Sequence, residues 1–364
     1  MSLAGFLRDG FSAELVAPAV SAAVASEAKA QGVRLRNLGE HFLARTSSVA
    51  FVESWVRETV FSRHQKRWSE VKGDYDLVVN LSNCFMVRSD VWYLLGSVAE
   101  AIREIEPNLA PSMRITAAAI APVLGALDSK QVASSAALST IHVASSLACQ
   151  RAYERRNVRV DRIIYPPLDT AKFRPTTPMP SEDYCLTYLG KELDVAPVVD
   201  LADAGIPIVG FGSKFKDLPR RLLEHPRVRV LGRVSDSQLV ELYSHAKFLI
   251  FPFSAEPFGY VPIESMACGT PVLTYDRQGP GETVIHGDTG WKAADAHDLV
   301  ARGVQVWRGG RIPAAMRDRC AKRSLEFSLA RVGEAWASLM RSVRALGGEG
   351  AQRAMRDPPA EAPS

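Results

Sequence analysis

Two glutamates stand eight positions apart, between a short apolar run and a segment that predicts a helix. Glu256 lies in a loop after the apolar residues 248–253, and Glu264 lies two positions after Pro262. Proline is favoured at the first position of a helix, where its missing N–H costs nothing. In an open parallel sheet, ligands bind beside loops of this kind, at the carboxyl ends of strands. Carboxylates repel phosphate, so we expect this pair to hold hydroxyl groups, such as those of a ribose and a sugar.

A plainer explanation of the same pair stays open. A glutamate near a helix start stabilises the helix by complementing its partial positive charge, and a loop glutamate can simply be solvated. The free N–H groups of the same helix start also suit a phosphate. The two explanations therefore differ in whether Glu256 and Glu264 face a ligand.

The flanking residues predict one strand–loop–helix–strand unit that positions these side chains. Residues 248–253 are apolar and short, as in a buried strand. Gly269 and Pro271 predict the end of the helix, and residues 272–275 predict the next buried strand. Because a helical crossover joins parallel strands, the sheet at this place should be parallel.

The segment EPFGYVPIE, residues 256–264, resembles the E-x7-E signature of retaining nucleotide-sugar glycosyltransferases of glycosyltransferase family four (group 1). The segments SMACGTPVLTY, QGPGE and HGDTGW resemble that family in the same order, and VRVLGRVSDSQLVELYSHAKFLIFPF resembles the part before the signature. The stronger similarity covers residues 228–292, and a weaker one reaches back to residue 165. Several motifs in register are more specific than a single glycine pattern.

This resemblance implies a site for a UDP- or GDP-linked sugar and assigns roles within the signature. Glu264 would bond the ribose hydroxyls, and Glu256 would hold the donor sugar as a catalytic residue. Backbone N–H groups near Phe258 and Gly259 would orient that sugar. Tyr260, at the end of the loop, is also assigned to donor binding. The implied transfer retains the anomeric configuration and needs no metal or other cofactor.

The resemblance also implies basic and apolar contacts to the nucleotide. Lys191 stands where the family has a basic residue that meets the pyrophosphate, and we assign it to catalysis, the alternative being a surface lysine. The family has a second lysine a few residues on, but Pro197 stands there, so Lys214 or its neighbour Lys216 would substitute. In the turn that corresponds to the nucleotide side, Arg233 and Val234 would contact the donor, with Val234 against the base.

At 364 residues the chain has room for two domains, and 47% hydrophobic with 23% charged residues is a globular composition. We predict an α/β chain with the GT-B fold: two Rossmann-like domains that face a cleft and contain parallel sheets. The predicted divisions are an acceptor domain at 1–174, a donor domain at 175–328, a terminal helix at 329–346 that returns to the first domain, and a disordered tail at 347–364.

The beginning of the chain departs from the family pattern. Residues 1–10 show no clear strand or glycine-rich loop, and the alanine-rich pattern predicts a helix over 13–30, followed by a strand at 33–38. We therefore expect a shortened or rearranged N-terminal domain, which bears on the acceptor side of the site. In the C-terminal domain, residues 278–282 hold two glycines and predict a tight loop.

An amphipathic, basic helix is predicted over residues 51–72. It is either packed on the domain with a solvated basic face or a membrane-surface helix with Trp55 and Trp68 at the headgroups. The triplet at 74–76 is Asp-Tyr-Asp, which can hold a metal when it follows a strand; here it precedes one, so turn chemistry is favoured. His142 is either a structural histidine or the counterpart of a family histidine that faces the sugar. Residues 115–148 show only weak periodicity.

The net charge of +4 suits a phosphorylated ligand or an anionic membrane surface, and we expect no nucleic-acid partner. Five cysteines without a C-x-x-C pair predict neither a disulfide framework nor zinc. No apolar run approaches about 18 residues and no signal-peptide pattern is seen, so we expect a cytoplasmic protein, or one peripheral at a membrane. The acceptor would be a glycan, a lipid-linked sugar or a small molecule. Two alternatives are a non-catalytic nucleotide-sugar-binding or scaffold protein and a GT-B isomerase or phosphorylase.

Overall fold

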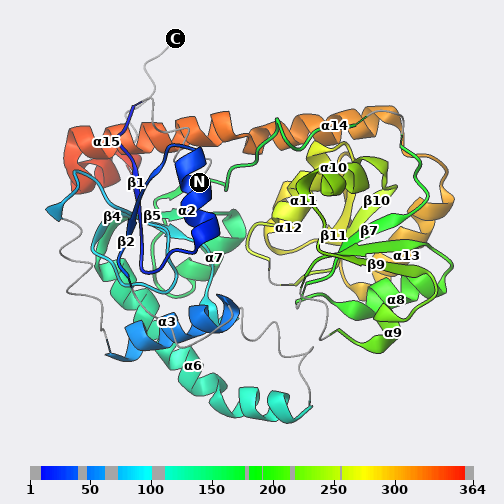
Figure 1. Ribbon diagram of the computed structural model, residues 1–364, viewed down its shortest axis with the longest axis horizontal. Helices are drawn as coiled ribbons and strands as arrows, with labels where there is room; N and C mark the ends of the chain where they lie inside the picture. Colours follow the sequence, from blue (N-terminus) through cyan, green and yellow to red (C-terminus); the bar gives the residue numbers. More distant parts are fainter. Residues whose placement is uncertain are drawn as a thin grey trace.

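The computed structural model describes residues 10–39, 47–61, 73–100, 111–176, 180–190, 192–213, 218–254 and 256–356. Figure 1 shows two halves side by side, each built on its own sheet. Every pairing between the named strands of this described part is parallel. Parallel strands need crossover connections, and helices supply these in both halves. The architecture is the α/β arrangement with parallel sheets that the sequence predicts.

The C-terminal half contains a six-stranded sheet in the order β12-β11-β10-β7-β8-β9. The chain winds from β7 outward to β9 and then restarts on the other side of β7 with β10. This reversal is the switch point at which open α/β sheets bind ligands. The strands are β7 (Cys185–Tyr188), β8 (Ile208–Phe211), β9 (Val228–Gly232), β10 (Phe248–Phe251), β11 (Val272–Tyr275) and β12 (Gly290–Ala293).

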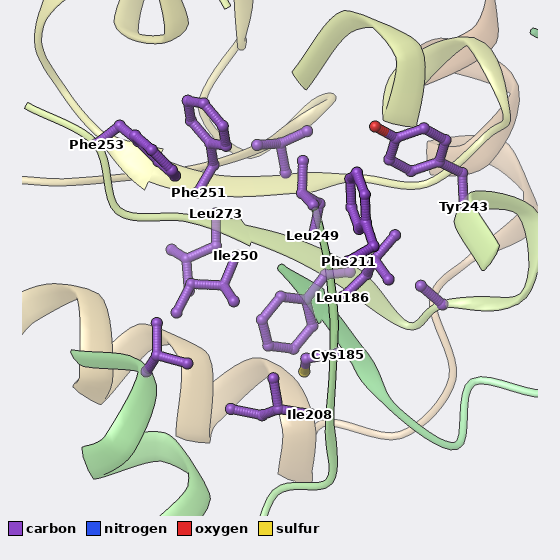
Figure 2. Packing of buried hydrophobic residues seen from close by; sticks show 14 of the residues in the cluster. Cys185, Leu186, Ile208, Phe211, Tyr243, Leu249, Ile250, Phe251, Phe253 and Leu273 are labelled. Carbon is purple, nitrogen blue, oxygen red and sulfur yellow. The ribbon is translucent and has the colours of Figure 1, made fainter. Parts of the chain in front are cut away.

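Helices cover both faces of this sheet, so its central strands are apolar throughout. Every residue of β8, β10 and β11 is buried, as expected for strands covered on both sides. Figure 2 shows the packing of Leu186, Ile250 and Phe251 with their neighbours. The covering helices are α8 (Val195–Asp203), α9 (Arg220–Leu223), α10 (Asp236–His245), α11 (Tyr260–Ala267), α12 (Gln278–Thr283), α13 (Ala296–Arg308), α14 (Ala314–Ser324) and the 3-10 turn η3 (Leu325–Phe327).

The N-terminal half has a four-stranded sheet in the order β3-β4-β5-β6 and a separate pair, β1-β2. Two of its strands are only two residues long. The elements are β1 (Glu14–Ala17), α2 (Ala22–Ala30), β2 (Arg34–Asn37), α3 (Ser47–Phe61), β3 (Val79–Asn80), β4 (Ser89–Leu94), α6 (Pro111–Ala137), β5 (Ser139–Ala144), α7 (Leu147–Glu154) and β6 (Arg162–Ile163).

The last helix, α15 (Leu329–Arg356), lies along the N-terminal half (Figure 1). Trp336 is 2% exposed and meets Tyr93 of β4 with ring centroids 5.1 Å apart. Gly347, with φ of 69°, interrupts the helix, which then continues to Arg356. Residues 348–356 are therefore helical where the sequence predicted a disordered tail; Gln352 beyond the kink donates to the carbonyl oxygen of Thr140 at 2.6 Å. Residues 357–364 lie outside the described part.

Two further predictions for the N-terminal half need correction. The helix predicted over 13–30 begins only at Ala22, after Ser21 caps it, because Glu14–Ala17 pairs with β2 as a strand and Pro18 interrupts a helix there. Trp55 is fully buried against the core of this half, so it does not lie at a membrane headgroup layer. Trp68 and the other residues at 62–72 lie outside the described part.

Among the described residues, no helix is both long and apolar enough to span a membrane. All five cysteines are buried, and no disulfide joins any two of them.

Candidate functional site

The loops that follow β7 and β10 meet at the switch point of the six-stranded sheet. Leu193 after β7 forms a bridge with Phe253 after β10, and the Asp194 N–H donates to the carbonyl oxygen of Pro252 at 3.0 Å. Glu192 lies close enough to Glu256 to disfavour its charged form. The sequence assigned no role to Glu192, because the two acids are 64 positions apart and only the strand order brings them together.

The carboxylate of Glu256 is turned toward its own loop. Its Oε1 atom accepts the Gly259 N–H at 3.1 Å. Burial raises the pKa of Glu256 above its ordinary value, and the N–H groups of Phe258 and Gly259 oppose that shift. Glu256 is therefore a partly buried, hydrogen-bonded group at the start of α11 and not a solvated loop residue.

Glycines let two backbone segments approach each other at this loop. Gly259 has φ of 90°, in the left-handed region, and stands immediately before α11. Gly279 lies so close to Phe258 that an added Cβ would be 2.3 Å from the Phe258 Cα. The Gly279 N–H also donates to the carbonyl oxygen of Glu256 at 3.1 Å. The loop carrying Glu256 is thus held by the backbone of α12.

Residues 278–283 form the short helix α12, which corrects the prediction of a tight loop at 278–282. Glycine is unfavourable inside a helix in general, but here the two glycines meet neighbouring backbone: Gly279 meets Phe258 and Gly281 meets Asp276. Close packing therefore outweighs local helix propensity.

Glu264 is held by a side chain from another helix. The hydroxyl of the fully buried Tyr243, on α10, donates to its Oε2 atom at 2.9 Å. Burial raises the pKa of Glu264, whereas the Tyr243 hydroxyl and the positive charge of Lys172 lower it. The helix begins at Tyr260, so Glu264 lies beyond its first turn and Pro262 is its third residue, not its first. Glu264 consequently does not act as a first-turn complement to the helix dipole.

Lys172, in the segment that joins the two sheets, lies near Glu264. It pairs with Asp236 at the start of α10 and lies over the Phe173 ring, 5.3 Å from its centroid. Sequence reasoning missed both Lys172 and Tyr243. Nothing local to the glutamate signals these partners, which lie 92 and 21 positions from Glu264.

Aromatic rings pack behind the loop of residues 256–259, which is called the donor loop from here on. Phe258 is 4% exposed and lies 5.9 Å from Tyr165, 5.7 Å from Phe327 and 5.4 Å from Tyr260, measured between ring centroids. Tyr260 is 45% exposed. Phe258 is therefore a buried anchor that fixes the loop, and the predicted contact of its N–H group with a sugar stays a prediction.

Arg233 and Val234 follow β9, as predicted, and their side chains line a groove of about 490 Å³. The groove runs along α10 at the edge of the sheet, because β9 is the last strand in the strand order. Neither Glu256 nor Glu264 lines it. The lining residues are Tyr184, Leu231, Arg233, Val234, Gln238, Glu241, Leu242 and His245.

Lys191 and Lys214 both lie outside the described residues, so their predicted contacts with the pyrophosphate stay predictions. A described cation near the donor loop is Arg277, two residues after β11 and immediately before α12. It donates to the Ser254 hydroxyl at 2.9 Å and lies over the Tyr275 ring at 4.2 Å.

The N-terminal half touches the donor loop through the ends of its own strands. The Ser146 hydroxyl caps α7 and donates to the carbonyl oxygen of Pro257 at 2.5 Å. Both carboxylate oxygens of Glu282, on α12, accept the Leu147 N–H, at 3.1 and 3.0 Å. His142 takes no part in this contact, because its ring nitrogens lie 2.8 and 3.3 Å from the carbonyl oxygens of Arg159 and Ala136. The structural explanation of His142 is therefore favoured.

Within the described part, no group of three or more His, Cys, Asp and Glu side chains is arranged to hold a metal ion. Asp74 of the Asp-Tyr-Asp triplet pairs with Arg36 at 2.6 Å. The triplet lies before β3, whereas the contact of Ser146 with the donor loop lies at the other edge of the sheet, where its strands end. The expectation of a reaction without metal stays a prediction.

Comparison with known proteins matches residues 202–324 to the family model "Glycosyl transferases group 1". The chain is 40% identical over 96 residues to "Alpha-1,3/1,6-mannosyltransferase alg-2" of Neurospora crassa, which covers 26% of this chain and 20% of that protein. It is 28% identical over 136 residues to "N-acetyl-alpha-D-glucosaminyl L-malate synthase" of Bacillus anthracis, with 36% and 35% covered. The chain thus matches a fifth to about a third of the length of these two relatives.

Two solved structures share the architecture over 94% of this chain. HepE of Anabaena in complex with UDP and glucose has a TM-score of 0.65 at 15% identity, over 94% of both chains. Sucrose-phosphate synthase of Thermosynechococcus elongatus has a TM-score of 0.67 at 18% identity, over 94% of this chain and 92% of the other. At these identities the likeness concerns the fold, and it confirms the predicted GT-B arrangement. Residues 202–324 are thus similar to the group 1 glycosyl transferases, within a chain that has the fold of these two structures.

Proposed function

We propose that this protein is a retaining glycosyltransferase that moves a sugar from a UDP- or GDP-linked donor to an acceptor. The observation that carries the proposal is the segment from Glu256 to Glu264, which places two partly buried carboxylates beside the switch point within the group 1 domain. Both acids have hydrogen-bond partners that hold them in place, which is how a site keeps carboxylates ready for hydroxyl groups. The complexes of HepE with UDP and with UDP-glucose support a nucleotide-sugar donor.

Each acid has a separate role in this proposal. Glu264 bonds the ribose hydroxyls with the oxygen that Tyr243 does not hold, and Glu256 receives hydroxyls of the donor sugar. The N-terminus of α11, together with Lys191 and Arg277, stabilises charge on the departing diphosphate. In this account the leaving phosphate takes the proton of the acceptor on the same face of the sugar, and no metal ion takes part.

The acceptor side of the proposal rests on exposed leucines. Leu81 follows β3, Leu95 follows β4 and Leu147 begins α7 after β5, and they are 48%, 36% and 40% exposed. Because β3, β4 and β5 are parallel neighbours, these leucines stand at one edge of their sheet, the edge that contacts Pro257. Exposed apolar side chains beside a site favour an acceptor with an apolar part, such as a lipid-linked sugar, over a wholly polar glycan.

A screen of radiolabelled UDP- and GDP-sugars, with and without lipid extract, tests the proposal. We expect transfer from one donor class, greater when lipid is present, with the anomeric configuration retained in the product by NMR and activity unaffected by EDTA. Donor binding without turnover would instead indicate a binding or scaffold protein. Conversion without an acceptor would indicate an isomerase or phosphorylase, and failure to bind either nucleotide would refute the proposal.

Glu256→Ala gives the matching test of the site. Because Glu256 is assigned to the sugar and Glu264 to the ribose, turnover should fall by more than the affinity for free UDP or GDP does. Equal loss of turnover and of nucleotide affinity would contradict the assignment.

A further inference from the structure

Glu282 joins the two halves of the molecule by a contact that the donor site does not use. It lies on α12 of the C-terminal half, and both of its carboxylate oxygens accept the Leu147 N–H of α7 in the N-terminal half. The first N–H groups of a helix have no partner within the helix and carry a partial positive charge. A carboxylate therefore suits this position, and Ser146 caps the same helix end from within its own half.

The same contact continues onto the donor loop. Ser146 donates to the Pro257 carbonyl oxygen at 2.5 Å. Gly96, at the end of β4, has φ of 116°, and an added Cβ would stand 3.0 Å from the Pro257 Cγ. Pro257 is thus enclosed by backbone and a cap residue of the N-terminal half. Figure 1 shows α7 and α12 facing each other where the two halves meet.

Backbone contacts connect Glu282 firmly to the loop that carries Glu256. At one end of α12 the Gly279 N–H holds the carbonyl oxygen of Glu256. At the other end Arg323, on α14, donates to the carbonyl oxygens of Glu282 and Thr283 at 3.3 and 3.1 Å. A movement of Glu282 relative to α7 therefore moves the donor loop with it.

We propose that Glu282 is a positioning residue, a latch between α12 and α7 that fixes the Glu256 loop against the N-terminal half and opens when the halves separate. The role for donor binding rests on the proposed function; the latch itself rests on the contacts alone. No atom of Glu282 needs to touch a substrate for this role.

Protonation couples to the latch because closure buries the carboxyl group. Burial raises the pKa of Glu282 to about 7, and the N–H groups of Leu147 and Ala148 oppose the rise. When the halves separate, water returns to the carboxyl group and its pKa falls toward the ordinary value. Closure thus takes up a proton, and it is favoured as the pH falls from about 7 toward the ordinary value. One proton changes the closure constant by at most about tenfold per pH unit.

The charged and titratable groups that face Glu282 or its helix are Arg151 and Cys149 of α7, Tyr165, Arg323 of α14 and Lys292 of β12.

Hydrogen exchange of the Leu147 and Ala148 amides, corrected for the intrinsic rate at each pH, tests the latch in the full chain. In the wild type we expect protection to decrease as the pH rises from 6 to 8. Glu282→Gln keeps an acceptor oxygen without a titratable proton, so its protection should not depend on pH. Glu282→Ala should exchange about tenfold faster at pH 6, which corresponds to the loss of one hydrogen bond. Glu154→Gln, which changes an exposed glutamate on the same helix, should follow the wild type.

Two results would overturn the latch: wild-type exchange in Glu282→Ala, or the same pH dependence in Glu282→Gln as in the wild type. Calorimetry with UDP and GDP on these variants separates the latch from the proposed function. Faster exchange in Glu282→Ala, with no nucleotide bound by any variant, would leave the latch standing and refute the donor site. Nucleotide binding in the wild type, together with unchanged exchange in Glu282→Ala, would support the donor site and refute the latch.

Discussion

The two ends of the segment 256–264 are held in different ways. At the loop end, backbone meets backbone: the Gly279 N–H donates to the carbonyl oxygen of Glu256, and Gly279 approaches the main chain of Phe258. At the helix end, side chain meets side chain, since Tyr243 donates to Glu264. Backbone packing leaves no room to adjust, whereas a side-chain partner can be removed with little movement. We therefore expect large, structural effects from substitutions at the first end and graded effects on ligand binding at the second.

The largest effect is expected for Gly279→Ala. The new Cβ would stand 2.3 Å from the Phe258 Cα and 2.4 Å from its carbonyl oxygen, so the donor loop or α12 must shift. Overpacking of this kind costs about 1–3 kcal/mol of the free energy of unfolding, or more where backbone must move. Urea unfolding measures this loss, and nucleotide affinity should fall with it. Gly73→Ala, where an added Cβ meets nothing within 4 Å, should be close to neutral. Equal stability of both variants would show that the loop end is adjustable after all.

A feature of this segment could be predicted from the sequence when the residues that form it lie close together along the chain. The strand, the loop, the helix and the E-x7-E spacing are local, so the residues 248–275 indicate them correctly, apart from a helix start displaced from Pro262 to Tyr260. The helix over Gln278–Thr283 was missed, because close contact with Phe258 requires glycines that ordinary propensity counts against a helix.

The partners of the acids could not be predicted, because tertiary packing decides them. Tyr243, Lys172 and Glu192 reach the two glutamates only through the order of the strands and the path of the segment between the sheets. The N-terminal half shows the same limit. Its two-residue strands and the weakly periodic α6 carry little local signal, and its contacts with the donor loop come from Gly96, Ser146 and Leu147.

At the helix end, Glu264→Ala should weaken nucleotide-sugar binding without unfolding the protein. The loss should be about 1.5–3 kcal/mol, the contribution of a hydrogen bond to a charged group, which corresponds to roughly 10- to 150-fold in Kd. Titration calorimetry with the donor found in the screen measures it, and unfolding in urea checks that stability is retained. Unchanged donor affinity would exclude Glu264 from the ribose contact.

The smallest effect is expected for Tyr243→Phe, which keeps the buried ring and removes only the hydroxyl. Glu264 then loses the donor to its Oε2 atom, and nucleotide affinity at neutral pH should fall by about 1 kcal/mol, roughly fivefold.

The direction in which the pH dependence of donor binding shifts in Tyr243→Phe gives a sharper test. The Tyr243 hydroxyl lowers the pKa of Glu264 by stabilising the carboxylate, so its removal raises that pKa further above the ordinary value. Donor binding that needs the carboxylate should therefore weaken at a higher pH in Tyr243→Phe than in the wild type as the solution is acidified. Because Tyr184→Phe removes a hydroxyl that bonds the Leu242 carbonyl oxygen and not Glu264, it should leave the pH profile where it was. Identical profiles for Tyr243→Phe and the wild type would mean that the Tyr243 hydroxyl does not control the protonation of Glu264 on which donor binding depends.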